Sequence, residues 1–250
     1  MTPDIAFWIA AGLATLLLGL AKGGIAIAAS LVVPVMSLVM PPINAAGLLL
    51  PLFLLSDIYA VWLFRSSFSR RNLTILIPAG VLGVIAGFLL VSHISENTSK
   101  LIVAGVGLWF LIDRLRDRYT RVERPPRPAD LPRGLFWGIL AGVTSYISHS
   151  GGPPFQAYML PQKLPKMVFA GTATFFFACV NLAKLPAFIL AGQVTLASTE
   201  KVILLTPLAL IGARMGYRLT EILSDKLFFA LIELALLVVS FKLLWDVATS

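Results

Sequence analysis

Two short polar stretches in this sequence combine glycine pairs with residues that bind anions. Stretch 21–24 has a lysine before two glycines, and stretch 149–152 has a histidine and a serine before two glycines. We expect a helix to start directly after each pair, and a helix N-terminus presents unpaired N–H donors and a partial positive charge. The sequence therefore suggests an anion site. The plainer interpretation is a tight turn, with Lys22 reaching toward lipid headgroups.

Asp57 is an acidic side chain well inside the apolar segment 44–64. An ionisable group within a membrane segment is costly and is a functional hypothesis by default. Asp57 could pair with Lys22 or carry a coupling proton, and a purely structural ion pair is the alternative. Its counterpart in the second half is Asn181, which cannot titrate, so any proton role would be asymmetric.

Lys184 follows Asn181 by about one helical turn, close enough to share a face. It could be a second anion contact or a partner of Glu233. Thr172 could line the same pocket or bond back to its own helix. The predicted substrate-binding residues are Lys22, Gly23, Gly24, His149, Ser150, Gly151, Gly152, Gln156, Thr172, Asn181 and Lys184. No catalytic residue, metal site or cofactor is predicted.

The composition is that of a polytopic membrane protein. Hydrophobic residues make up 58% and charged residues 13% of the 250 residues, against about 25% charged residues in a soluble domain. The apolar runs are continuous, which indicates helices and excludes a β-barrel. The net charge of +8 comes mainly from arginines between these runs. We therefore expect contacts with anionic lipids at the cytoplasmic face and no nucleic-acid partner. The single cysteine allows no intrachain disulfide.

The apolar runs predict two sets of helices around a basic, proline-rich linker. We expect a first membrane repeat over 1–112, a basic cytoplasmic linker over 113–133 and a second membrane repeat over 134–250. The N-terminus lacks a basic signal-peptide region, so the first apolar run is expected to be retained. The expected helices are 5–20, 25–40, 44–64, 73–91, 101–115, 135–147, 153–160, 168–190, 202–219 and 227–247.

The two halves align as an internal repeat. The glycine pairs superpose, Asp57 falls on Asn181, Gly83 falls on Gly212, and further matches are Pro41 with Pro165, Pro78 with Pro207 and Gly87 with Gly216. Each half has an odd number of segments, so the second half is expected to enter the membrane from the opposite side. Inverted repeats are typical of secondary transporters, which bind substrate near the midplane at discontinuous helices.

Loop charges predict the orientation. With the linker inside, the basic loops 65–71, 163–166 and 214–226 also fall inside, and both termini fall outside. Segment 153–160 is too short to span alone. We therefore favour re-entrant or broken helices at both glycine pairs, with tips that meet near the midplane. The fold class is an all-α membrane protein with two inverted repeats.

Several of these motifs resemble the sulfite exporter TauE/SafE family. They are the stretch 19–24 with Val33-Pro34, Pro51 and Ser56-Asp57, and, in the second half, the stretches 149–154, 158–161, 169–172 and 181–186. The resemblance covers nearly the whole chain. It implies a multi-pass carrier of the bacterial inner membrane for small anions, often oxidised sulfur compounds such as sulfite, sulfoacetate or other organosulfonates.

The leading hypothesis is a secondary transporter that exports a small sulfur-containing oxyanion, with protons as a candidate coupling ion. No nucleotide-binding P-loop is present, so a gradient would supply the energy. An anion channel and a membrane-embedded enzyme acting on a lipid phosphate are the alternatives, and an assembly factor without a substrate is a third. We expect no enzyme, because adjacent residues such as His149 and Ser150 rarely form a catalytic pair.

Overall fold

The computed structural model describes residues 5–40, 42–91, 93–120, 125–148, 150–190 and 199–249, and within them every regular element is helical. This confirms the all-α fold class for the described residues. The elements are α1 (Ile5–Lys22), η1 (Ala26–Ala28), α2 (Ala29–Ser37), α3 (Pro42–Leu63), α4 (Arg70–Leu90), α5 (Glu96–Thr120), α6 (Leu131–Ser148), α7 (Gly152–Met159), η2 (Leu160–Gln162), α8 (Lys166–Leu190), α9 (Thr199–Ile222) and α10 (Asp225–Ala248).

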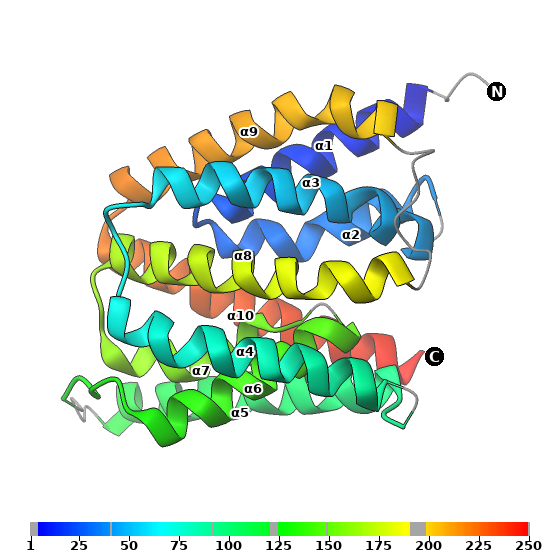
Figure 1. The fold of residues 1–250 in the computed structure, drawn as a ribbon. Coiled ribbons are helices and arrows are strands. Elements are labelled where there is room, and N and C mark those ends of the chain that lie inside the picture. The colour runs from blue at the N-terminus through cyan, green and yellow to red at the C-terminus, as the bar shows by residue number, and fades with distance from the viewer. Residues whose placement is uncertain are drawn as a thin grey trace.

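The long helices run side by side through the molecule (Figure 1). Among the described residues, five helices are long and apolar enough to cross a membrane, namely α1, α4, α8, α9 and α10. Many large apolar side chains point outward, and Ile58 and Trp245 are each 70% exposed. So much exposed apolar surface marks a membrane-facing exterior. The chain is therefore a membrane protein.

Glycines set the closest helix contacts. α1 packs along α9, and α6 packs along α4. A Cβ added to Gly19 of α1 would lie 2.2 Å from the carbonyl oxygen of Ala209, and one added to Gly142 of α6 would lie 2.2 Å from that of Gly80. Small residues allow this close backbone approach, which drives helix association in lipid.

On the side of α4 and α9, these two contacts use equivalent positions of the predicted repeat. The alignment that places Gly83 on Gly212 also places Gly80 on Ala209. A Cβ at Gly19 would meet Ala209 and Gly212, and a Cβ at Gly142 would meet Gly80 and Gly83. The first helix of each half thus packs against the fourth helix of the other half. Such an exchange is what a two-fold relation between the halves produces, and it supports the inverted repeat, which stays a prediction.

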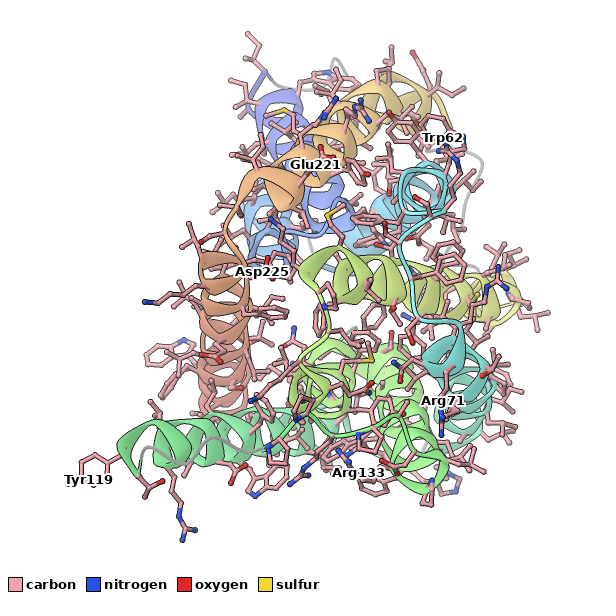
Figure 2. The ribbon with its side chains drawn as sticks, turned by 90° about the vertical axis from the view of Figure 1, so that its left-hand side faces the viewer. Trp62, Arg71, Tyr119, Arg133, Glu221 and Asp225 are labelled. Carbon is pink, nitrogen blue, oxygen red and sulfur yellow. The ribbon has the colours of Figure 1, made fainter. Side chains whose placement is uncertain are left out.

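The loops that we predict to be cytoplasmic gather at one end of the bundle. Figure 2 looks onto this end, where Trp62, Arg71, Tyr119, Arg133 and Asp225 mark the ends of α3, α4, α5, α6 and α10. The start of α1 and the end of α10 lie at the opposite end (Figure 1). The side of the membrane that each end faces stays a prediction.

The predicted linker 113–133 is partly helical, which corrects the expected helix ends at 115 and 135. α5 continues to Thr120 and α6 starts at Leu131, so regular structure is missing only at 125–130 among the described residues of this stretch. Arginine and leucine are good helix formers, so basic residues did not end α5. At the other side, Asp130 Oδ1 accepts the backbone N–H of Arg133 at 2.9 Å and so caps α6.

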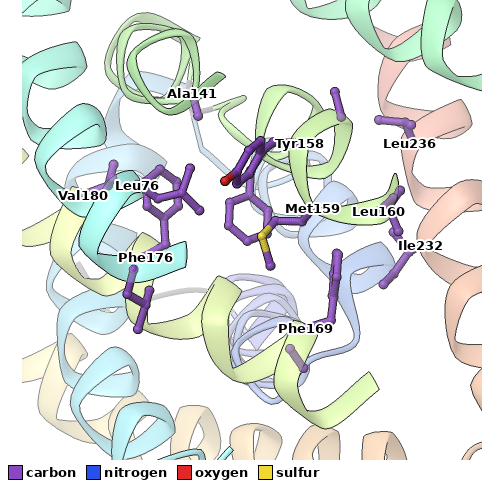
Figure 3. Close-up of a cluster of buried hydrophobic side chains, with 14 of the residues drawn as sticks. Leu76, Ala141, Tyr158, Met159, Leu160, Phe169, Phe176, Val180, Ile232 and Leu236 are labelled. Carbon is purple, nitrogen blue, oxygen red and sulfur yellow. The ribbon is translucent and has the colours of Figure 1, made fainter. Parts of the chain in front are cut away.

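The elements after both glycine pairs are too short to span a membrane. α2 has 9 residues and α7 has 8 residues, which correspond to about 14 and 12 Å against a hydrocarbon core of about 30 Å. Their shortness supports re-entrant or broken helices at both glycine pairs, which stay a prediction. Figure 3 shows Tyr158 and Met159 of α7 surrounded by Leu76, Phe169 and Phe176 of the neighbouring helices. α7 is thus embedded in the main core.

Candidate functional site

The chain between α1 and η1, which contains Gly23 and Gly24 and which we call the first break, contacts α9; the second break contains Gly151 and Gly152. Gly24 has a φ of 109°, a backbone conformation that a side chain disfavours. A Cβ at Gly24 would also lie 2.5 Å from Thr220 Oγ1. That hydroxyl donates to the carbonyl of Gly23 at 2.9 Å. The tight turn after Lys22 therefore depends on glycine and fixes the start of the lysine side chain.

Gly24→Ala is expected to lower the free energy of unfolding by about 1–3 kcal/mol, because it combines backbone strain with a clash against Thr220. Gly152→Ala is the matched control in the second break, since the nearest of its neighbours to an added Cβ is Gln156 Nε2 at 4.0 Å. Thermal unfolding of both variants in detergent measures the difference. Equal losses of stability would contradict the assignment.

Lys22, Asp57, Asn181 and Lys184 form a connected polar cluster, which we call the lysine cluster. Lys22 Nζ donates to Asp57 Oδ1 at 2.5 Å, and Asn181 Nδ2 donates to Asp57 Oδ2 at 2.7 Å. Lys184 Nζ donates to Asn181 Oδ1 at 3.5 Å. Asp57 is 3% and Lys184 2% exposed. The structure thus contains the Lys22–Asp57 pair, one of the two alternatives that the sequence left open.

The lysine cluster carries an excess of positive charge. Its two ammonium groups and one carboxylate formally leave one positive charge among these side chains. Each carboxylate oxygen has one donor, whereas among the described residues the Lys184 ammonium contacts a neutral amide oxygen at 3.5 Å. The ring of Phe53 lies 5.0 Å from Lys22 Nζ and adds a cation–π contact. An anion is the ligand that such a cluster favours.

Helix α8 presents one face to this region. The residues of this face follow a spacing of four and three, which places them along one side of a helix. We call them the α8 stripe: Ala170, Thr174, Phe177, Asn181 and Lys184. A Cβ at Gly24 would lie 3.3 Å from Ala170 Cβ, and Thr174 Oγ1 donates to the carbonyl of Lys22 at 3.3 Å. The first break therefore lies against the start of the stripe.

The second break reaches the same stripe farther along. A Cβ at Gly151 would lie 3.2 Å from the Phe177 ring and 2.6 Å from the carbonyl oxygen of Ala141. Ala170 and Phe177 are seven residues apart, about 10 Å along a helix. The two breaks thus flank one stripe, with their tips offset along it.

Side chains near the second break complete the region. Ser150 Oγ donates to the carbonyl of Ser148 at 2.9 Å. Gln156 is 9% exposed, and its buried Oε1 has no partner among the described residues. His149 lies outside the described residues. Among the described residues at this break, Gln156 is thus a buried polar side chain with an unpaired acceptor atom.

The backbone amides contribute less than the sequence suggested. The N–H groups of Gly23 and Gly24 donate to the carbonyls of Gly19 at 2.9 Å and Ala21 at 3.1 Å. In the second break, Pro153 and Pro154 carry no N–H. The donors at the first break are therefore side chains, and the anion site that we expected from its helix N-terminus is already satisfied internally.

Thr172 bonds back to its own helix, which is the second of the two alternatives that the sequence left open. Its hydroxyl accepts the backbone N–H of Ser69 at 2.9 Å and donates to the carbonyl of Val168 at 2.6 Å. It thereby joins α8 to the loop before α4. Sequence reasoning missed Phe53 and Thr220, because contacts between distant elements leave no local signal.

Comparison with known proteins identifies the family. No curated protein and no solved structure matches the chain with statistical significance. A family model described as sulfite exporter TauE/SafE matches residues 5–243. This range contains both glycine breaks, the lysine cluster and all the long helices except the last five residues of α10. The chain belongs to the sulfite exporter TauE/SafE family, whose members are membrane transporters and not enzymes.

Proposed function

We propose that this protein is a secondary transporter that exports a small sulfur-containing oxyanion, such as sulfite, sulfoacetate or another organosulfonate. The family match supports the transport of sulfur anions. The excess positive charge of the buried lysine cluster is the observation that supports an anionic substrate. Two inverted halves would expose this cluster to each side of the membrane in turn.

Lys184 is the principal substrate contact in this proposal. A charged ammonium that is 2% exposed is costly to bury, and one neutral amide at 3.5 Å offsets little of that cost. A substrate oxyanion that contacts the Lys184 ammonium and accepts from Asn181 Nδ2 would supply the missing counter-charge. Lys22 is close to this position, because Lys22 and Asn181 both donate to the Asp57 carboxylate. The substrate would thus be held by charge-assisted hydrogen bonds.

The second break forms the other side of the proposed site. Gln156 has an unpaired buried Oε1, and the nearest neighbour of a Cβ at Gly152 lies 4.0 Å away. We assign Gln156, Gly151 and Gly152 to this side, together with His149 and Ser150. The Nε2 group of Gln156 is the donor that would bind a substrate oxygen, because Oε1 only accepts and an ionised oxyanion supplies no donor.

Orientation and coupling complete the proposal. The end of the bundle with the basic loops would face the cytoplasm of a bacterial inner membrane, where it contacts anionic lipids. Arg71 and Arg133 at that end fit this placement (Figure 2). Protons are the proposed coupling ion, and Asp57 is the carboxyl that would carry them.

Flux in proteoliposomes tests the proposal. Purified protein should transport sulfite, sulfoacetate or thiosulfate, with a rate that depends on an imposed pH gradient. Lys184→Met should reduce this flux at least ~100-fold, about 2.7 kcal/mol of lost substrate and transition-state binding. Lys226→Met is the control, because Lys226 is exposed at the start of α10. No flux of any of the three anions in the wild type, or wild-type flux in Lys184→Met, would refute the assignment.

A further inference from the structure

The Asp57 carboxylate is itself an oxyanion held in a site of matched donors. One oxygen accepts a hydrogen bond from the Lys22 ammonium of α1 at 2.5 Å, and the other accepts one from the Asn181 amide of α8 at 2.7 Å. The Asp57 side chain is 4% exposed. Sulfite and sulfonates also present neighbouring oxygens that accept such donors. The protein therefore already contains an occupied oxyanion site in its interior.

We infer that Asp57 is a built-in competitor of the substrate. Its carboxylate occupies the oxyanion site on Lys22 and Asn181, and the sulfur oxyanion replaces it there during transport. This inference rests on the proposed function and adds an order of events to it. In the transporter without substrate, the Asp57 carboxylate occupies the oxyanion site. Only an anion that binds Lys22 and Asn181 better than Asp57 does can replace it.

Asn181 makes the competition unavoidable. Its Nδ2 binds Asp57, while its Oδ1 faces Lys184. A substrate that approaches Lys184 and takes the amide donor of Asn181 must remove that donor from Asp57. Two anions that shared Asn181 would repel each other strongly, because the site is buried and poorly screened. Both anions therefore cannot stay bound together in their charged forms.

The displaced carboxylate needs a new partner, since an unpaired buried charge is unstable. The charged and titratable groups recorded around Asp57 are Lys22 from α1 and Lys184 and Cys179 from α8. α2 and the middle of α9, 202–213, carry no titratable residue in the sequence. Because both ammonium groups bind the substrate in this inference, a proton is the counter-charge left for the carboxylate, and one proton on Asp57 would accompany each bound anion.

The inference can be tested without transport. Asp57→Ala empties the oxyanion site while it keeps Lys22 and Asn181, so small anions should bind there. We expect formate, methanesulfonate and sulfite at saturating concentration to raise the melting temperature of the purified variant by about 5 °C. Sulfite should raise that of the wild type much less, because Asp57 still competes.

Asp246→Ala is the matched control. It removes the carboxylate of another pair, in which Lys242 Nζ lies 2.5 Å from Asp246 Oδ2, but these side chains are 40% and 30% exposed. Water fills such a gap, so the same anions should leave its melting temperature unchanged. A general effect of the anions on the micelle or the protein surface would appear in both variants.

Three results would overturn the inference. Stabilisation of Asp57→Ala by formate alone would show a structural carboxylate site that rejects sulfur oxyanions. No stabilisation by any of the anions would show that no oxyanion site remains. An equal effect of sulfite on wild type and variant would show that Asp57 does not compete. The proposed function fails separately, if wild-type proteoliposomes carry no sulfur oxyanion although the variant is rescued.

Asp57→Asn keeps the test decisive if Asp57→Ala does not fold. The amide has the shape of the carboxylate without its charge, so the competitor is weakened and Lys22 is free to bind an anion. Sulfite should then bind this variant at least ~10-fold more tightly than the wild type in a calorimetric titration, about 1.4 kcal/mol. Equal or weaker binding would overturn the inference.

Discussion

Lys22→Met is expected to abolish transport and to lower the free energy of unfolding by about 3–5 kcal/mol. The variant leaves the Asp57 carboxylate, which is 3% exposed, without the ammonium that lies 2.5 Å away in the wild type. Removal of one partner of a buried pair costs more than removal of both. The double variant Lys22→Met/Asp57→Asn should therefore recover most of the stability, but none of the transport.

Thermal unfolding and proteoliposome flux of the two variants measure these effects. Lys242→Met is the control, because it breaks a pair with Asp246 whose side chains are 30–40% exposed, and such pairs contribute about 0–1 kcal/mol. If the double variant were as unstable as Lys22→Met, the cost would come from lost packing of the lysine stem and not from the unpaired charge.

Gly142→Ala is expected to cause the second large loss of stability. Its Cβ would lie 2.2 Å from the carbonyl oxygen of Gly80, so α6 and α4 must separate along their whole contact. Backbone atoms cannot rotate away as a side chain can. We expect a loss of about 1–3 kcal/mol or more. Gly19→Ala should cost a similar amount, because its Cβ would meet the Ala209 carbonyl at the equivalent position.

Gly105→Ala separates this effect from the general consequence of replacing glycine in a helix. A Cβ at Gly105 has no neighbour within 4 Å, so the gain in helix propensity should leave the protein as stable as the wild type or more so, by up to about 1 kcal/mol. The melting temperatures of the three variants give the comparison. A loss for Gly105→Ala equal to that for Gly142→Ala would contradict the role assigned to close backbone contact.

The helices and their reversals were predictable from the sequence because they depend on local patterns. Continuous apolar runs and the short segments behind the glycine pairs indicated long helices with a short helix after each pair, which the structure has. The linker was not predictable to the same degree. Arginines that are read as loop residues are also good helix formers, so α5 extends to Thr120.

The candidate site was predictable in its charges and less so in its geometry. Lys22, Asp57 and Asn181 stood out as polar groups inside apolar segments, and the structure brings them together with Lys184. Hydrogen bonding by the backbone was not visible in the sequence. The amide of Gly24 donates to Ala21, which makes the first break a source of charge and not of free N–H groups.

Equilibrium binding of sulfite to purified protein tests the central claim most directly, because it needs neither a gradient nor a known direction of transport. Wild type and Lys184→Met are compared by calorimetric titration, with Lys226→Met as the surface control. We expect saturable binding to the wild type and to Lys226→Met, and binding to Lys184→Met that is at least ~100-fold weaker, about 2.7 kcal/mol. Binding to Lys184→Met with wild-type affinity would show that the lysine cluster is not the oxyanion site.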